Sequence, residues 1–256
     1  MIKRLEKINP DFFEKLNSDH YKRRVKSNFE AYGTEYDFCQ FFALLDDSEE
    51  IKLLISQFNS TMVVANSIDC TFDETICNDI LTLISMNKPQ TIEMSVRLAE
   101  KIKDNLNDYE KCDRTEFEFV SKNYLPNMVV DECPKLDDVF SILKTSFPVI
   151  ADSYDLWLTD TSHKVRRGLS QCFVLGNFTT ATIQYICDNT ALVGHVATIP
   201  EERGRFHARK LLYWMGEKLN KEGVNVRLFA RSHRVSYYEE IGFKDIGMDI
   251  VFERKL

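Results

Sequence analysis

Residues 195–212, HVATIPEERGRFHARKLL, constrain the fold of this chain more than any other segment. A mostly apolar run ends at Thr198, and Pro200 blocks its continuation as a strand because proline has no backbone N–H to donate. A turn rich in arginine and glycine follows, and the apolar spacing after it predicts a long helix from about Arg203 to Glu222. The segment therefore predicts a strand that enters a long helix through a short turn.

This strand-to-helix turn predicts a binding site for an anion. The first N–H groups of a helix have no acceptors within it, and the helix dipole adds to the attraction for negative charge. Four basic residues fall close together here, Arg203, Arg205, Arg209 and Lys210, in a protein whose formal net charge is −7. We expect a phosphate-bearing ligand; the alternative interpretation is a solvated basic helix start in which Gly204 is only a turn residue.

Helices and strands alternate along the rest of the chain. Only 9 glycines and 6 prolines occur, so long structureless linkers are not expected. In the first half the patterns predict helices at 11–29, 74–85 and 96–106, and strands at 37–45, 51–58, 61–67, 91–94 and 116–120. In the second half they predict helices at 135–146, 203–222 and 235–241, a helix or an ordered loop at 154–167, and strands at 128–130, 169–175, 179–187, 191–198, 224–230 and 248–253.

The order of these elements is similar in the two halves, which predicts an α/β (α+β) protein with an internal duplication. We place a polar connector at residues 110–127 and divide the chain into domains 1–115 and 116–256. The first half has neither an Arg-rich turn nor the second motif described next.

That second motif follows the strand predicted at 224–230. Residues 236–243 read SYYEEIGF, with Tyr238 four residues before Gly242. Together the two segments resemble the GNAT superfamily of N-acetyltransferases, in which an Arg-rich loop opens a long helix and a Y-E-x-x-G-F signature comes later. The resemblance covers roughly residues 131–256 and implies a mixed, largely antiparallel central sheet flanked by helices. By the same resemblance, the first half is a degenerate GNAT-like copy without a cofactor site.

The resemblance implies acetyl-CoA as cofactor and assigns residues to it. The pantetheine arm adds to the main chain of one strand, here Val196, Ala197 and Thr198, whose unpaired backbone groups it satisfies. The pyrophosphate loop, Arg/Gln-x-x-Gly-x-Gly/Ala, maps onto Arg203, Gly204, Arg205, Phe206, His207 and Ala208, and Arg209 follows it. Phe206 departs from the pattern, because glycine at that position lets the backbone approach the phosphates closely.

Catalytic roles also come from the resemblance. Tyr238 occupies the family's proton-donor position, and we predict it as the general acid, with Tyr237 as the alternative. His195, at the end of the strand, is the preferred candidate for general base; His163, Asp160, Glu240 or a water molecule are alternatives. In the segment 154–167, the possible lining residues of the acceptor site are Tyr154, Trp157 and Asp160. The alternative is an amphipathic helix that packs Leu156, Trp157 and Val165 on the sheet.

Composition excludes several other classes. Seven cysteines contain no C-x-x-C pair and five histidines form no close cluster, so we predict no disulfide framework and no metal. The acidic charge is unfavourable for a nucleic-acid partner, and no secretory signal or spanning stretch is evident, so we expect a cytoplasmic protein without a membrane partner.

The sequence thus predicts an N-acyltransferase that moves an acetyl or other acyl group from acyl-CoA to a primary amine by direct attack in a ternary complex. The expected partner is a small-molecule amine, and the sequence leaves open whether the chain forms oligomers. The alternative is a non-catalytic protein of the same fold that binds acyl-CoA or a protein partner.

Overall fold

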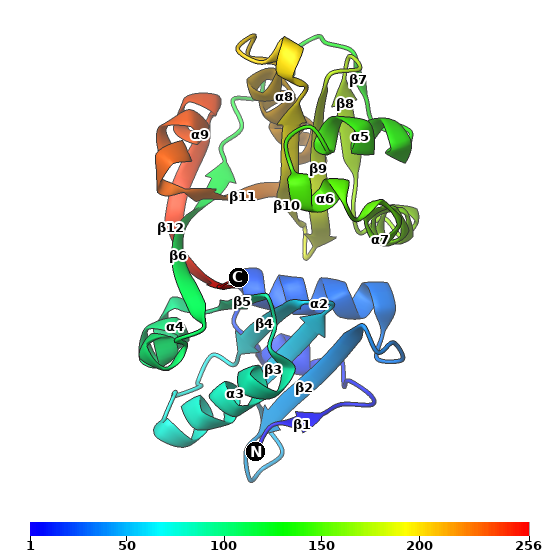
Figure 1. The fold of residues 1–256 in the computed structure, drawn as a ribbon. Coiled ribbons are helices and arrows are strands. Elements are labelled where there is room, and N and C mark those ends of the chain that lie inside the picture. The colour runs from blue at the N-terminus through cyan, green and yellow to red at the C-terminus, as the bar shows by residue number, and fades with distance from the viewer. Residues whose placement is uncertain (256) are drawn as a thin grey trace. The chain divides into compact units, whose positions relative to one another are not determined.

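The computed structural model describes residues 1–255, apart from the side chain of Val149. The chain forms two compact units (Figure 1): unit 1 contains residues 1–114 together with 248–255, and unit 2 contains residues 115–247. The domain division predicted at residues 115 and 116 differs from this arrangement at the C-terminus, because the last eight described residues pack in unit 1.

Unit 1 is a twisted sheet with helices packed against it. The strand order is β1-β2-β3-β4-β5-β12, all neighbours being antiparallel except the parallel pair β4 and β5. Its strands are β1 (Lys3–Arg4), β2 (Cys39–Leu45), β3 (Ile51–Phe58), β4 (Thr61–Asn66), β5 (Thr91–Met94), the first part of β6 (Tyr109–Phe119) and the last part of β12 (Phe243–Arg254). Its helices are α1 (Asp11–Lys15), α2 (His20–Tyr32), α3 (Glu74–Asn87), α4 (Val96–Ile102) and the short 3-10 helix η1 (Lys103–Asn105).

Unit 2 has the order β7-β8-β9-β10-β11-β6, where β10 and β11 are the parallel neighbours. Its strands are the second part of β6 (Tyr109–Phe119), β7 (Val130–Asp131), β8 (Cys172–Leu175), β9 (Thr179–Cys187), β10 (Thr190–Thr198), β11 (Asn225–Arg231) and the first part of β12. Its helices are α5 (Leu136–Leu143), α6 (Pro148–Ala151), α7 (Tyr154–Arg166), α8 (His207–Lys221) and α9 (Val235–Ile241), with 3-10 turns η2 (Pro200–Glu202) and η3 (Ser232–Arg234).

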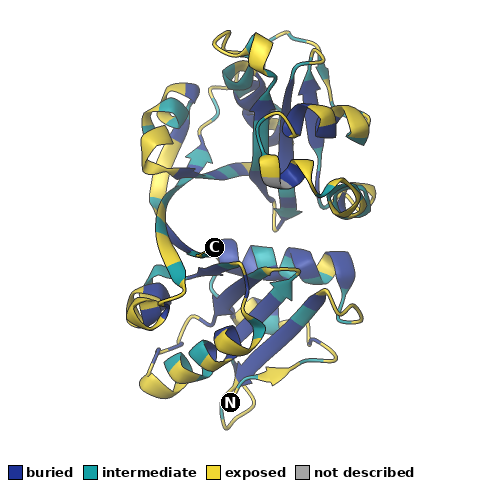
Figure 2. Ribbon diagram, viewed as in Figure 1, coloured by how far each residue is buried: buried dark blue, intermediate teal, exposed yellow. Residues whose placement is uncertain are grey.

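Both units therefore confirm the mixed, largely antiparallel sheet flanked by helices, and Figure 2 shows the buried residues concentrated in the strands. Local signals act as expected. The Asp73 carboxylate accepts a hydrogen bond from the Ile76 amide at 2.8 Å and caps α3, and the turn residues Asp188 and Asn189 adopt positive φ between β9 and β10.

The predicted polar connector is wrong, because much of it forms β6. Phe117 and Phe119 are buried in the core of unit 2, whereas the alternate residues Glu116 and Glu118 form ion pairs with Arg227 of β11. Arg114, one of the charges that suggested a connector, likewise forms an ion pair with Asp249 of β12.

A buried polar network holds the end of β12 in unit 1. The Asp249 carboxylate, 3% exposed, accepts hydrogen bonds from the Tyr21 hydroxyl at 2.5 Å and from Arg114 Nε at 2.7 Å. Beside it, His20 Nε2 lies 2.6 Å from Glu93 Oε2. Burial opposes ionisation of Glu93, but the hydrogen bond and charge of His20 outweigh it and hold the pKa of that carboxyl below its usual range.

We expect Asp249→Ala to destabilise unit 1 by about 3 kcal/mol, because it leaves the Arg114 guanidinium and the Tyr21 hydroxyl without their shared acceptor. The free energy of unfolding from urea denaturation measures the effect. The control Lys244→Ala, at an exposed position of the same strand, should change it by less than about 0.5 kcal/mol. Equal stability of the two variants would show that the network does not hold the strand.

Candidate functional site

The parallel strands β10 and β11 separate partway along unit 2. Their register pairs only residues 190–192 with residues 225–227, and β10 is irregular between Val193 and Val196. From Val196 to Thr198, β10 pairs with β9 on its other side. Among the described residues, the edge of β10 that faces β11 therefore has no partner strand beyond this point. Apart from the Thr198 carbonyl, which accepts from Arg203 Nε at 3.1 Å, its backbone can pair with a ligand that has amides of its own.

The turn after β10 presents a row of backbone donors. Helix α8 begins at His207, later than predicted, because Gly204 and Phe206 adopt positive φ of 79° and 64° and delay the first helical turn. Within residues 1–255, the N–H groups of Phe206, His207, Ala208 and Arg209 donate to no acceptor. Four such groups at a helix N-terminus form a site for a phosphate or diphosphate.

Phe206 takes up a conformation that glycine adopts at no steric cost. Its φ of 64° and ψ of 16° lie in the left-handed region, where a Cβ crowds the following carbonyl. Although the residue is phenylalanine, its backbone therefore has the conformation that glycine would adopt without strain at this position. Its ring is 64% exposed and lies over the Arg209 guanidinium, 5.5 Å from ring centroid to Cζ.

A hollow of about 580 Å³ joins the open edge of β10 to this turn; we call it the β10–α8 hollow. It collects most of the predicted site residues from three elements, β10, the turn with α8, and α9: Val196, Thr198, Arg203, Gly204, Phe206, His207, Ala208, Arg209 and Tyr238. Sequence analysis missed other lining residues, among them Phe147, Gly194, Glu202 and Arg234, because no local motif marks them.

Tyr238 presents a phenol to this hollow from α9. Its ring packs against Phe117 and Phe243, with centroids 5.9 and 6.0 Å away, and its hydroxyl has no hydrogen-bond partner among the described residues. Burial, with a smaller contribution from Tyr237, raises the pKa of Tyr238 above its ordinary value of about 10. The side chain therefore stays protonated at neutral pH and retains a proton to donate.

The arginines of the loop divide into different roles. The Arg203 guanidinium donates to the carbonyls of Thr198 and Thr145 and to Ser146 Oγ at 3.0–3.3 Å, so it ties the end of β10 to the segment after α5. Arg205 forms an ion pair with Glu202 and does not line the hollow. Arg209 forms an ion pair with Glu240, and its Nε is buried without a hydrogen-bond partner.

His195 and Ala197 do not line the hollow. Ala197 packs in a cluster with α5, whereas Val196 packs in the cluster with α8. The His195 ring contacts Phe147, with centroids 4.9 Å apart, and its backbone N–H donates to Thr182 Oγ1 at 2.9 Å. His195 therefore contacts a residue that lines the hollow, Phe147, without lining it itself.

The predicted acceptor-lining residues have packing partners instead. Tyr154 and Trp157 both contact the Phe140 ring of α5, with centroids 4.7 and 5.4 Å away, and Asp160 pairs with Lys164. Of the residues in the packing alternative, Trp157 packs in this way against α5, whereas Leu156 and Val165 are exposed.

In unit 1, residues of the chain itself occupy the strand edge beyond the pairing of β4 with β5 and the N-terminus of α3. Past the end of the pairing between β4 and β5, the Asn66 carbonyl accepts from the Asn17 amide at 3.0 Å and Leu16 bridges to Ser67, so the strand edge is taken. At α3, the Asp73 side chain occupies the helix N-terminus. Among the described residues, the strand edge and the helix N-terminus therefore have partners in unit 1, whereas their counterparts in unit 2 are left for a ligand.

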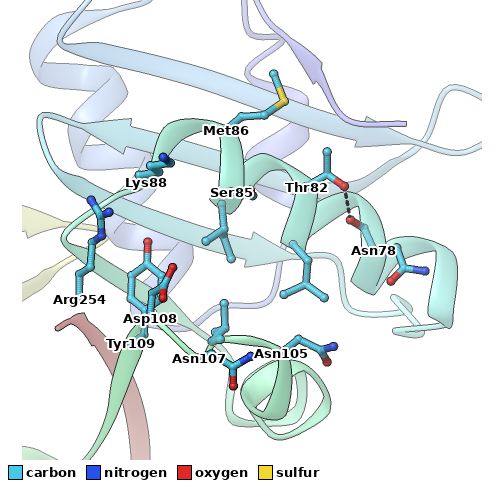
Figure 3. Close-up of a pocket in the computed structure, with 13 residues that line it drawn as sticks. Asn78, Thr82, Ser85, Met86, Lys88, Asn105, Asn107, Asp108, Tyr109 and Arg254 are labelled. Carbon is cyan, nitrogen blue, oxygen red and sulfur yellow. Dashed lines mark hydrogen bonds between the residues drawn. The ribbon is translucent and has the colours of Figure 1, made fainter.

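Another hollow in unit 1, about 710 Å³, lies between α3 and the segment 105–109 (Figure 3). Asn78, Thr82, Lys88, Asn105 and Arg254 are among the residues around it, and none of the predicted site residues is there. In the described part of the chain, no three His, Cys, Asp or Glu side chains gather as metal ligands, and no helix has the length and apolar character to cross a membrane.

The chain is similar to solved structures of known proteins, and its sequence alone matches none. No protein-family model and no curated protein matches the sequence. A GNAT-family acetyltransferase from Colwellia psychrerythraea is 13% identical with a TM-score of 0.57, and all of both chains is covered. A GCN5-related N-acetyltransferase from Sphaerobacter thermophilus is 14% identical with a TM-score of 0.64, covering 91% of this chain and 85% of the other.

The chain has a GNAT fold. A tandem GNAT protein from the clavulanic acid biosynthesis pathway, 9% identical with a TM-score of 0.60, covers 98% of this chain and 97% of its own. The match over both halves fits the similar order of elements in the two units.

We expect one acetyl-CoA to bind per chain, because unit 1 closes its strand edge with Leu16 and its helix N-terminus with Asp73. Isothermal titration calorimetry of the full chain with acetyl-CoA gives this number directly. A stoichiometry of two would contradict the assignment of the site to unit 2 alone.

Phe206→Gly should be more stable than Phe206→Ala by about 1 kcal/mol, since both remove the ring but only glycine removes the crowding at positive φ. Thermal or urea unfolding of the two variants measures the difference. If alanine proved as stable as glycine, residue 206 would not hold the left-handed conformation in solution.

Proposed function

We propose that this protein is an acyl-CoA-dependent N-acyltransferase that transfers an acetyl group from acetyl-CoA to a primary amine in a ternary complex. One observation carries the proposal: the β10–α8 hollow joins an open strand edge, four unpartnered amides and a protonated tyrosine. These are the groups needed to hold an amide-bearing arm, to bind a diphosphate and to protonate a leaving thiolate.

The donor is bound by backbone more than by charged side chains. The amides of 206–209 bind the diphosphate, and the edge of β10 from Thr198 toward Gly194 pairs with the pantetheine amides. The thioester then lies toward the point where β10 and β11 meet. Arg203 acts through the loop, since its hydrogen bonds fix the end of β10 on which both contacts depend.

Transfer requires one bond to form and one to break. The amine nitrogen, once deprotonated, attacks the thioester carbon, the new C–N bond forms, and the C–S bond breaks. The departing thiolate takes the phenolic proton of Tyr238, and the tyrosinate is reprotonated by the proton that the new amide nitrogen loses. His195 is the proposed base for the incoming ammonium, which then approaches from the side of the sheet where α5 and Phe147 lie.

Tyr238→Phe should lower kcat by about 10²-fold or more, with the Kd for acetyl-CoA nearly unchanged, because it removes only the proton donor. Initial rates across a panel of primary amines and calorimetry measure the two quantities. Because burial raises the pKa of Tyr238, the wild-type rate should not fall on this account until the pH exceeds about 10. Turnover by the phenylalanine variant at the wild-type rate would remove Tyr238 from the mechanism.

His195→Gln should lower kcat by about tenfold or more at neutral pH and leave acetyl-CoA binding intact, because the ring does not line the donor hollow. His163→Gln, on α7, is the matched control and should retain the wild-type rate. A rate that responds equally to both substitutions would argue against His195 as the base. Binding of acetyl-CoA with no transfer to any amine would favour the non-catalytic alternative.

A further inference from the structure

A second hollow adjoins the β10–α8 hollow in unit 2. It has a volume of about 670 Å³ and lies between α8, α9 and the segment 126–128; we call it the α8–α9 hollow. Phe206 and Arg209 line both hollows, so the two meet at these side chains. Its volume is in the range of small-molecule sites.

The chemistry of the α8–α9 hollow suits a nucleoside phosphate. The aromatic and apolar faces of Phe206, Tyr213 and Met128 are suited to contact with a flat base, and Lys210 adds a positive charge. Within residues 1–255, Lys210 forms no ion pair. Arg209 leaves its buried Nε without an acceptor although its Nη2 is paired with Glu240, so the guanidinium retains a donor for a further oxygen.

Phe206 is the residue at which this chain departs from the glycine of the predicted pyrophosphate loop. It takes a left-handed backbone conformation at a cost in conformational energy and leaves a ring that is 64% exposed at the rim of both hollows. The contact with the Arg209 guanidinium orients the ring. An exposed aromatic ring held beside a diphosphate site is the platform on which a purine base stacks.

The direction in which coenzyme A runs along β10 decides which part of it lies in the α8–α9 hollow. Coenzyme A carries pantetheine on one side of its diphosphate and 3′-phosphoadenosine on the other. If pantetheine follows β10 toward Gly194 from amides 206–209, the nucleoside leaves on the other side, across Phe206 and Arg209.

Resting on the proposed function, we infer that Phe206 stacks on the adenine of the acyl donor in the α8–α9 hollow and that Lys210 binds its 3′-phosphate. The donor is then a free coenzyme A thioester, recognised through its nucleotide, and not an acyl group presented on phosphopantetheine alone. Phe206 is a specificity-determining residue for that nucleotide.

Calorimetry with three probes tests this inference: coenzyme A, dephospho-coenzyme A and 4′-phosphopantetheine. Phe206→Gly keeps the backbone conformation without strain, so it should bind coenzyme A about tenfold or more weakly and 4′-phosphopantetheine as the wild type does. Phe206→Trp retains an aromatic face and should restore most of the affinity for coenzyme A. Lys210→Ala should weaken coenzyme A binding and leave dephospho-coenzyme A unchanged.

Lys221→Ala, at the far end of α8, is the matched control for loss of a positive charge and should change none of these affinities. Wild-type affinity for coenzyme A in Phe206→Gly, or a loss equal for all three probes, would overturn the inference while leaving the proposed function in place. Failure of the wild-type protein to bind any of the three probes would refute the proposed function, and the inference with it.

Discussion

The separation of β10 from β11 is the constraint on which the rest of the site depends. A parallel pair that continued in register would satisfy every backbone group of β10 and leave no edge for a ligand. The irregularity between Val193 and Val196 ends that pairing after Leu192, and the Arg203 guanidinium holds the far end of the strand against the segment after α5. The loop and the N-terminus of α8 follow β10, and Tyr238 on α9 follows β11, so all three line one hollow next to the ends of the two strands that separate.

The two units show how one order of elements gives either an open or a closed site. In unit 2 the chain leaves a strand edge and a helix N-terminus without partners. In unit 1 the chain supplies both partners itself, through Leu16 with Asn17 and through the Asp73 carboxylate. A capping aspartate stabilises α3 for the same reason that a phosphate would bind there. The difference between the units therefore lies in a few local contacts, within a shared arrangement of strands and helices.

Much of this could be predicted from the sequence because the signals are local. Apolar periodicity located most elements, Asp73 marked a helix start, and the motifs around Arg203 and Tyr238 contain most of the residues that line the β10–α8 hollow. Residues brought in by tertiary structure, such as Phe147 and Arg234, carry no local mark. Polar composition suggested a connector at 110–127, whereas ion pairs with Arg227 and Asp249 make its first part a strand. The positive φ of Phe206 could not be predicted either, because phenylalanine has no preference for that backbone conformation.

The placement of residues 248–255 in unit 1 has a consequence for synthesis of the chain. Ile250, Val251 and Phe252 are at most 2% exposed and pair with β5, yet the ribosome makes them only after the whole of unit 2. Domains usually fold in the order in which they are translated. Here most of unit 1 is translated first, but its sheet stays incomplete until residues 248–255 follow unit 2, so the edge of β5 stays open while unit 2 emerges. Synthesis of unit 2 therefore comes before unit 1 can complete its fold.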